Sequence, residues 1–521
     1  MPLFQDLSMT RRFRTLFPGI RIGMMAMTAL SVSGCLMVGP DYKRPQAIVS
    51  ARFKELKPAG GWMQASPQMA AWPKGEWWRV YDDPVLNGLE EQIVLSNQNV
   101  MEYEASYRKA RAMVTAARAS LYPTLAGSLS FARNSQGGNA TSTSGTRYST
   151  GSTSNTYAAQ VTADWDLDLW GKIRRQIQEQ VAAAQISAAD VANARLSYQS
   201  ELAQDYFALR YEESLKTLLE QSIGLYEHSL AIVRSQHSGG TVSGIDEYQS
   251  RTTLQQAQAS ATATDVNRAE YEHAIAVLIG KAPGDFSLPR SKMPSAIPPV
   301  PVTLPATLLQ RRPDIAAAER QMEEYNAEIG AAIATFYPDV SLSAAYGYSG
   351  APVQSLIQVA NRIWSLGASA SETLFEGGAR TAAVQEANAD YDSAVANYRQ
   401  VVLTALQDTE DQLSSLRILE RQAGQQQAAV ISALKAADIA MDEYRFGTAI
   451  YTTVITSQQT ALSDQQTALQ IQESRLVASI KLIADLGGGW DARNLPGKDS
   501  LQQDNPLVPG FLEKKQDDSV H

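Results

Sequence analysis

The sequence is poor in the residues that most reaction centres use. Its 521 residues include one cysteine and four histidines, so no disulfide can form within the chain. The histidines His228, His237, His273 and His521 lack metal-ligand spacing. None of the motifs GxSxG, HExxH, GxGxxG or GxxxxGK occurs. We therefore expect no enzyme activity, no catalytic or metal-binding residues and no cofactor.

An excess of positive charge and a long apolar run are also missing. The formal net charge is −9 and no block of Lys and Arg forms a stripe, so we expect no nucleic-acid partner. Beyond the N-terminus no stretch reaches the ~18 uninterrupted apolar residues of a membrane-spanning helix. If this chain crosses a membrane, it must do so as strands of a closed β-barrel, because lipid offers the backbone no hydrogen-bond partner.

The N-terminus has the pattern of a secretory signal. Arginines at positions 11, 12, 14 and 21 precede the apolar run 22–32, which is too short to span a bilayer. The following Val32-Ser33-Gly34-Cys35 resembles a bacterial lipobox, and an incidental thiol is the alternative. We expect residues 1–34 to be removed and Cys35 to carry lipid such as palmitate. In the lipoproteins that this pattern resembles, a residue such as Leu36 after the cysteine favours the outer membrane.

One pattern is written twice along the chain. Four short motifs recur in the same order at offsets of 206 to 215 residues: Tyr122-Pro123 and Tyr337-Pro338, Gly171 and Gly377, Gly240-Thr241 and Gly447-Thr448, Leu278-Ile279-Gly280 and Asp485-Leu486-Gly487. Each half reads helix, Tyr-Pro, short strands, Gly, long helix, Gly-Thr, long helix, Gly. This repetition predicts a duplication.

The segments between the helices alternate apolar and polar residues as strands do. The alternation covers 157–167, 340–348 and 364–374, and more weakly 124–133. Strands of about 9–11 residues with one apolar face suit a transmembrane barrel, and a half-buried soluble sheet is the alternative. The Gly-, Ser- and Thr-rich tract 134–156 predicts a solvated loop.

The number of strands predicts that several copies of the chain associate. Four strands are too few for a closed barrel, whose smallest form has about eight. If these segments lie in lipid, several chains must pool their strands, because an open edge would leave backbone groups unpaired.

The helical stretches are unusually long. Residues 172–236, 245–279, 379–446 and 450–486 contain no proline, and apolar residues recur in the first at three- and four-residue spacing. At 1.5 Å per residue, 65 residues extend roughly 100 Å. Such a rod could cross a bacterial periplasm.

With these features the chain resembles the TolC-like outer-membrane efflux proteins, in the lipoprotein branch typified by OprM and NodT. The similarity rests on PDYKRP at 40–45, WWRVYDDPVLN at 77–87, LLQRRPDI at 308–315 and LGGGW at 486–490. It implies a mostly α-helical fold with transmembrane β-strands. Long coiled-coil-like helices would form a periplasmic α-barrel, and four strands per chain would enter a trimeric twelve-stranded outer-membrane β-barrel.

The resemblance also implies a division of the chain and a function. The parts would be a signal peptide (1–34), an extended lipid-anchored segment (35–83), a first repeat (84–297), a second repeat (298–490) and a polar C-terminal tail (491–521). The protein would be the outer-membrane channel of a tripartite efflux pump, a passive conduit for drugs, toxic compounds or metal ions that extends into the periplasm. Its partners would be two further copies, a periplasmic adaptor, an inner-membrane transporter of the RND type and outer-membrane lipid. A type I protein-secretion duct is the nearest alternative, and a periplasmic adaptor lipoprotein is a more distant one.

Two glycine-containing turns interrupt the long helices at equivalent points. They comprise Gly240, Thr241, Val242, Ser243 and Gly244 in the first repeat, and Gly447, Thr448 and Ala449 in the second. Glycine permits the positive φ of a tight reversal. The resemblance implies that these tips dock onto the adaptor, through close backbone approach and hydrogen bonds from the Thr and Ser hydroxyls.

The resemblance further implies a gate near the tips. In TolC a tyrosine and an acid, helped by an arginine, hold the inner helix pair shut, and rings of aspartate narrow the mouth. Here Tyr444 and Asp246 stand at the tyrosine and acid positions, whereas Ala449, Thr453 and Thr456 replace the arginine and the ring acids. Two hypotheses stay open: an electrostatic lock, and a looser closure through Tyr444, Tyr451 and the hydroxyl groups.

Overall fold

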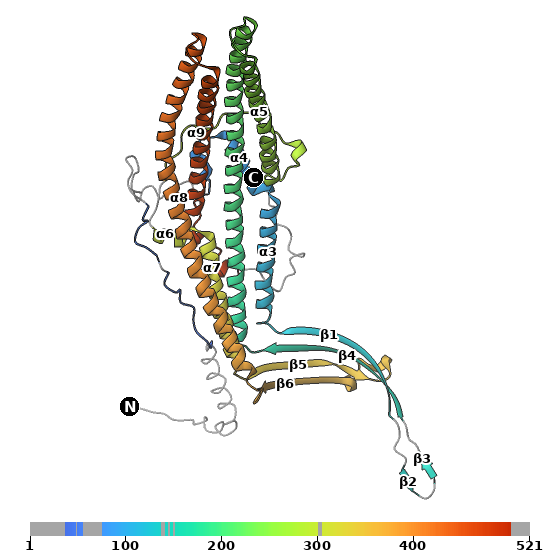
Figure 1. The fold of residues 1–521 in the computed structure, drawn as a ribbon. Coiled ribbons are helices and arrows are strands. Elements are labelled where there is room, and N and C mark those ends of the chain that lie inside the picture. Colours follow the sequence, from blue (N-terminus) through green and yellow to red (C-terminus); the bar gives the residue numbers. More distant parts are fainter. Residues whose placement is uncertain are drawn as a thin grey trace, which may run out of the picture.

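The chain forms a layer of long helices with a four-stranded sheet at one end (Figure 1). The computed structural model describes residues 37–47, 49–55, 75–136, 141–143, 146–148, 152–300 and 305–501. The expected signal peptide, Cys35 and most of the expected C-terminal tail lie outside the described residues.

The two halves of the chain repeat one series of elements. The first half contains α2 (Pro84–Ser96), α3 (Gln98–Ala119), β1 (Thr124–Gln136), β4 (Ser152–Asp166), α4 (Lys172–Ser238) and α5 (Gly244–Leu278). The second contains α6 (Pro305–Arg311), α7 (Pro313–Ala334), β5 (Asp339–Gly350), β6 (Arg362–Ser371), α8 (Ala379–Arg445) and α9 (Tyr451–Asp485). Helices α3 and α7 have 22 residues each, α4 and α8 have 67, and α5 and α9 have 35. These equal lengths support the predicted duplication.

Short elements connect the long ones. They are η2 (Trp77–Tyr81), β2 (Thr141–Thr143), β3 (Thr146–Tyr148), η3 (Pro283–Asp285), η4 (Val353–Ser355), η5 (Val359–Asn361), η6 (Ala492–Asn494) and α10 (Lys498–Leu501). Helix α2 begins where the Asp83 carboxylate accepts hydrogen bonds from the Val85 and Leu86 amides, and Pro84 fits its first turn. Helix α3 begins likewise at Asn97, whose side chain accepts from the Val100 amide.

The sheet is antiparallel, with the order β1-β4-β5-β6. Residues directly opposite each other share a face, and the register places most large apolar side chains of the four strands on the same one; Ile363, opposite Gly347, is on the other. Val161 lies opposite Tyr346, and Tyr346 lies opposite Trp364. The other face carries small and polar residues such as Gln160, opposite Gly347. The predicted strands with one apolar face are therefore confirmed, although the last strand ends at Ser371 instead of residue 374.

The tract 134–156 is not simply a loop. β1 continues to Gln136, β4 begins at Ser152, and the short strands β2 and β3 pair beyond them. An antiparallel ladder joins backbone groups and does not require apolar side chains, and Thr favours strands. The loop prediction was therefore wrong at both ends of the tract.

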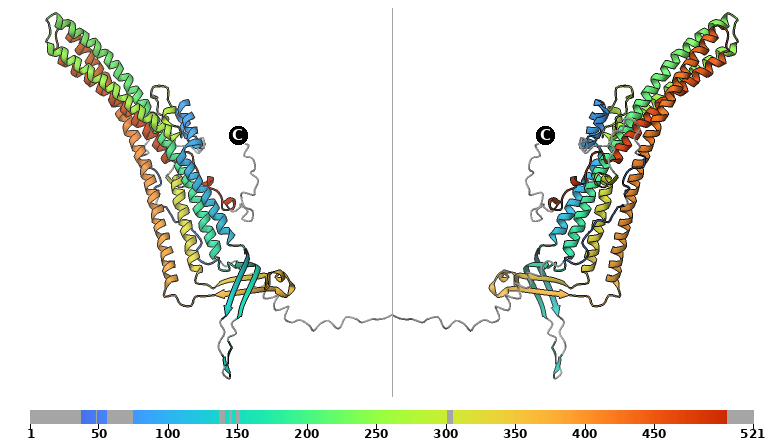
Figure 2. Two further views of the ribbon diagram at one scale, coloured as in Figure 1. Left: turned by 90° about the vertical axis from the view of Figure 1, so that its right-hand side faces the viewer. Right: turned by 90° about the vertical axis from the view of Figure 1, so that its left-hand side faces the viewer.

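Two long helical hairpins, α4–α5 and α8–α9, extend away from the sheet to the far end of the molecule (Figure 2). The main hydrophobic core lies where η2 and α2 meet the long helices, and it buries Trp77, Phe207, Tyr398 and Leu476. Within the described residues, no helix is long and apolar enough to cross a membrane.

The repeat extends to two tight contacts beside this core. Gly280 follows α5 with φ +69°, and an added Cβ would lie 2.2 Å from the Ser96 carbonyl oxygen at the end of α2. Gly487 follows α9 with φ +94°, and an added Cβ would lie 2.0 Å from the Arg311 carbonyl oxygen at the end of α6. Only glycine fits either position, because both the backbone conformation and the space exclude a side chain.

A largely buried cation, 12% exposed, joins three helices of the second repeat. The Arg312 guanidinium donates two hydrogen bonds to Asp314, at 3.1 and 2.7 Å, and lies 3.7 Å from both Asp408 on α8 and Asp485 on α9. Burial raises the pKa of Asp485 to about 7; Arg312 opposes this shift, and Asp408 and Asp314 add to it.

We predict that Arg312→Gln destabilises the fold by about 3 kcal/mol at neutral pH, because three carboxylates lose their shared cation. A raised Asp485 pKa favours folding at acidic pH, and this contribution is lost as the pH rises from about 4 to 7. Thermal unfolding at pH 5 and pH 8 should therefore show a larger loss for the variant at pH 8. Arg493→Gln is the control, because Arg493 is 84% exposed and bonds to Asp491 two residues away. An equal loss at both pH values would contradict this reading.

Candidate functional site

The two hairpin tips have the same hydrogen-bond geometry. At the α4–α5 tip Gly240 has φ +73°, its amide donates to the His237 carbonyl, and Thr241 donates from both its amide and its hydroxyl to the Gln236 carbonyl. At the α8–α9 tip Gly447 has φ +76°, its amide donates to the Tyr444 carbonyl, and Thr448 donates twice to the Glu443 carbonyl. Both are Schellman turns, which satisfy the last carbonyls of a helix and require a residue with positive φ.

These bonds use the two threonine hydroxyl protons that the tips were expected to offer a partner. The hydroxyl donors of Thr241 and Thr448 are occupied within the turns, and the Ser243 hydroxyl accepts from the Ile245 amide as the cap of α5, which starts at Gly244. Val242 and Ala449 are half-buried. A docking partner would therefore meet backbone groups and neighbouring side chains more than free hydroxyl donors.

Sequence reasoning missed the exposed apolar side chains that flank the tips. Phe446 is 84% exposed and Ile450 is 71% exposed, on either side of the second turn. Ile245 and Tyr248 are exposed just after the first turn. The signal was present in the sequence, since large apolar residues beside a predicted helix break have no helix face on which to be buried.

The gate candidates Tyr444 and Tyr451 lie together in an apolar cluster. Their ring centroids are 5.1 Å apart, and Val233 of α4, Ala440 of α8 and Val454 of α9 surround them. Burial raises the pKa of Tyr444 to about 12, with the Asp246 charge adding to the shift. The Tyr444 hydroxyl has no hydrogen-bond partner within the described residues, so the expected tyrosine–acid bond with Asp246 is not formed within this chain.

The candidate ring positions Thr453 and Thr456 are exposed on α9. The Thr456 hydroxyl donates to the Thr452 carbonyl one turn earlier. Thr456 also lines an open groove between α5 and α9, of about 530 Å³, together with Ile245, Tyr248 and Ile455. The groove wall is formed by hydroxyl, amide and apolar groups and includes no charged side chain.

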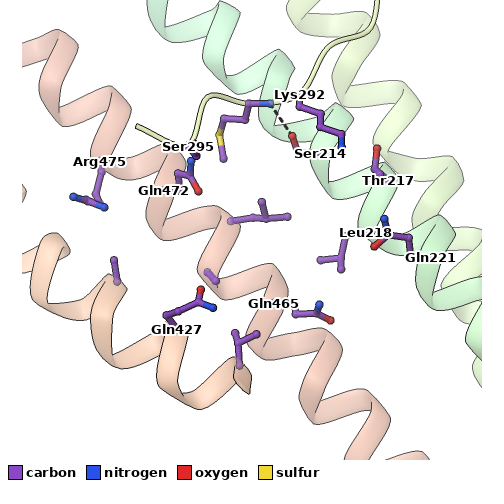
Figure 3. Close-up of a pocket in the computed structure, with 15 residues that line it drawn as sticks. Ser214, Thr217, Leu218, Gln221, Lys292, Ser295, Gln427, Gln465, Gln472 and Arg475 are labelled. Carbon is purple, nitrogen blue, oxygen red and sulfur yellow. Dashed lines mark hydrogen bonds between the residues drawn. The ribbon is translucent and has the colours of Figure 1, made fainter. Parts of the chain in front are cut away.

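A second cavity, of about 540 Å³, lies between α4, α8, α9 and the linker that follows η3 (Figure 3). Glutamines and small residues line it, and Lys292 and Arg475 are its charged residues. The Ser214 hydroxyl donates to the Arg210 carbonyl and accepts from the Met293 amide. The lining contains no carboxylate and no histidine. Among the described residues, no group of three or more His, Cys, Asp or Glu could hold a metal ion.

The described chain starts beside the sheet. The Val38 amide donates to the Trp170 carbonyl, and Arg175 at the start of α4 donates to the carbonyls of Val38 and Gly39. From there the segment follows the helices to Glu55, which forms an ion pair with Arg417 of α8. Cys35, two residues before Met37, lies outside the described residues.

Comparison with known proteins identifies this arrangement of fold, sheet and paired tips as that of the TolC-like outer-membrane channels. Residues 89–281 and 304–488 match the family described as outer membrane efflux protein, and the chain belongs to this family. The expected family resemblance is confirmed, and the chain is an outer membrane efflux protein.

The chain is similar to individual pump components along most of its length. The solvent efflux pump outer membrane protein SrpC of Pseudomonas putida is 29% identical over 465 residues, which are 88% of this chain and 97% of SrpC. Outer membrane protein OprJ of Pseudomonas aeruginosa is 27% identical over 475 residues, 89% of this chain and 95% of OprJ. Among solved structures, the outer-membrane channel OprN matches with a TM-score of 0.80 and 27% identity, over 87% of this chain and 99% of OprN.

We predict that Gly240→Ala and Gly447→Ala each weaken their own tip by about 1–2 kcal/mol, because both glycines have positive φ. No atom lies within 4 Å of either added Cβ, so the cost is confined to the backbone. Gly224→Ala in α4 and Gly424→Ala in α8 are matched controls with equally open surroundings; these should stabilise their helices by up to ~1 kcal/mol. Hydrogen–deuterium exchange at the Thr241 and Thr448 amides should accelerate about five- to thirtyfold in the tip variants alone. Unchanged exchange would refute the turn geometry.

Proposed function

We propose that three copies of this chain form the outer-membrane channel of a tripartite efflux pump, with twelve strands in one barrel. The sheet carries this proposal. It presents one apolar face, with Leu129, Trp364 and Leu366 among its exposed side chains, and among the described residues it ends at the edges of β1 and β6. In lipid those edges need partners, and four strands cannot close on themselves. Joining β6 of one copy to β1 of the next gives a closed ring.

Exposed apolar side chains on the helices support the same head-to-tail contact. Val266 on α5 and Met113 on α3 are exposed, and Leu403, Ile418 and Ile431 are exposed on α8. Exposed apolar residues spread along helices of a soluble region mark contact surfaces. A further copy would cover them.

The lipid anchor fits this orientation. Two residues span at most about 7 Å, so an acyl chain on Cys35 would enter the membrane close to Met37 and the sheet end of α4. The 67 residues of α4 then reach roughly 100 Å into the periplasm. The tips would there meet the periplasmic adaptor, and beyond it an inner-membrane transporter of the RND type.

The names of related proteins indicate the class of molecule that is exported. SrpC, TtgI and ArpC of Pseudomonas putida are named for the efflux of solvent, toluene and antibiotic, respectively. We infer that this chain conducts small toxic molecules passively, without chemistry of its own, and that the pump transporter supplies the energy. The expected division into signal peptide (1–34), anchored segment (35–83), two repeats (84–297 and 298–490) and tail (491–521) belongs to the same proposal.

For the gate, the apolar cluster favours the looser closure over the electrostatic lock. Tyr444 and Tyr451 are almost fully buried among aliphatic side chains. Position 449, where the lock would need an arginine, is alanine. Tyr444 forms no hydrogen bond to Asp246 within this chain. We propose that burial of these tyrosines is the main contribution to a closed tip.

We predict that Gly347→Ala prevents trimer formation, whereas Gly127→Ala does not. A Cβ at Gly347 in β5 would lie 2.3 Å from the Ala159 carbonyl oxygen of β4, and a Cβ at Gly127 in β1 meets no atom within 4 Å. The mass of the detergent-extracted protein, corrected for bound detergent, checks this: about three chains are expected for wild type and Gly127→Ala, and fewer for Gly347→Ala. A monomeric, water-soluble wild-type protein would end the proposal.

Efflux itself is tested in a host that lacks its own channel but keeps the pump transporter and adaptor. Wild type and Gly127→Ala should raise the minimum inhibitory concentrations of solvents and antibiotics, and Gly347→Ala should not. Restored export of a type I secreted polypeptide, with unchanged inhibitory concentrations, would instead favour the secretion duct.

A further inference from the structure

Two polar contacts join the α4–α5 hairpin to the α8–α9 hairpin near the tips. The Arg445 guanidinium of α8 donates to Nε2 of His228 on α4 at 3.0 Å, and the Gln458 amide of α9 donates to the Ser229 hydroxyl at 3.2 Å. Arginine carries no acceptor and stays charged at all relevant pH values. The 3.0 Å contact therefore requires His228 to be neutral, with its Nε2 lone pair facing Arg445.

The charges around His228 do not compensate a second cation. On α8, Arg445 also bonds to Asp442, at 3.3 Å. The Glu247 carboxylate of α5 is shared by Arg234 and Arg251. Glu227 is the chain neighbour of His228 on α4, and α9 has no charged residue between Tyr451 and Asp464. Among the described residues, no carboxylate lies within ion-pair distance of His228. Protonation would thus place two cations against each other.

We propose that His228 is a proton-sensitive catch: its protonation breaks the contact with Arg445, loosens the α8–α9 hairpin from the α4–α5 hairpin and favours opening of the tip at acidic pH. This rests on the proposed channel function. Histidine is the side chain suited to such a response, because its ring changes charge more readily around neutral pH than other side chains do. The pair is exposed, so each copy contributes a modest factor, about two- to fivefold in the closed-to-open ratio, and three copies act together.

Single-channel recording of purified protein from pH 8 to pH 5 tests the catch. Open probability of wild type should rise at least twofold across this range. His228→Gln keeps a neutral acceptor, so its open probability should stay low at every pH. Arg445→Gln removes the cation and should also abolish the pH response. His237→Gln is the matched control, since His237 lies on the same helix and contacts the Val242 carbonyl of its own turn. A full pH response in His228→Gln would overturn the proposal.

A distance measurement separates this inference from the channel function. Nitroxide labels at Ser235→Cys on α4 and Ala436→Cys on α8, both exposed positions, report the separation of the hairpins without conduction. The distance distribution should widen and shift outward as the pH falls from 8 to 5, and adding His228→Gln should cancel the change. If the distance responds but no conductance appears at any pH, the channel function fails and the catch stands. If conductance appears and the distance does not respond, the catch fails alone.

Discussion

The hydrogen bonds at the edges of the sheet are the constraint on which the rest depends. A helix closes its backbone bonds within itself, whereas the order β1-β4-β5-β6 leaves the outer sides of β1 and β6 without a strand partner among the described residues. Water could satisfy those groups, but the register gathers Leu129, Phe131, Trp364 and Leu366 on one face, which favours lipid. In lipid each unpaired group costs several kcal/mol. Both demands are met together only when copies join edge to edge, so in the proposed channel membrane insertion and assembly are one event.

The duplication shows which elements must keep equal lengths in the two repeats. The paired long helices have identical lengths in both halves, and the glycine contacts beside the core recur at Gly280 and Gly487. Rods that lie side by side must reach the same level at both ends, so a length change in one repeat would misalign the two tips. The strand pairs are under no such restriction: Gly171 follows Pro123 by 48 residues, and Gly377 follows Pro338 by 39. The extra length forms the polar extension of β1 and β4, where a hairpin can grow without disturbing its neighbours.

Much of the fold could be predicted because its determinants are periodic and local. The proline-free stretches predicted the ends of the long helices to within about two residues. The alternation of apolar and polar residues predicted the apolar face of each strand, which the register confirms. The polar extension was missed because ladder bonds leave no mark on side-chain pattern. The tip turns were predictable because glycine permits the positive φ of a tight reversal. The hydrogen bonds of the Thr241 and Thr448 hydroxyls inside the turns were not predictable, because they depend on which carbonyl each side-chain rotamer reaches. The Arg445–His228 contact joins residues 217 positions apart and has no local signature at all.

In the proposed gate, the energy of closure would be divided between apolar and polar contacts. Burial raises the pKa of Tyr444 to about 12, so the side chain stays uncharged at physiological pH. The cluster that it forms with Tyr451, Val233 and Val454 therefore does not titrate in that range. Such a cluster supplies a constant holding energy that scales with buried apolar area. Any regulated part must then come from the few polar contacts around it, which are weak individually because they face water. In the proposed gate, the apolar cluster would hold the tip closed and the titratable contact would add a smaller contribution. An adaptor that binds the exposed Phe446 and Ile450 would have to offset the sum of the two.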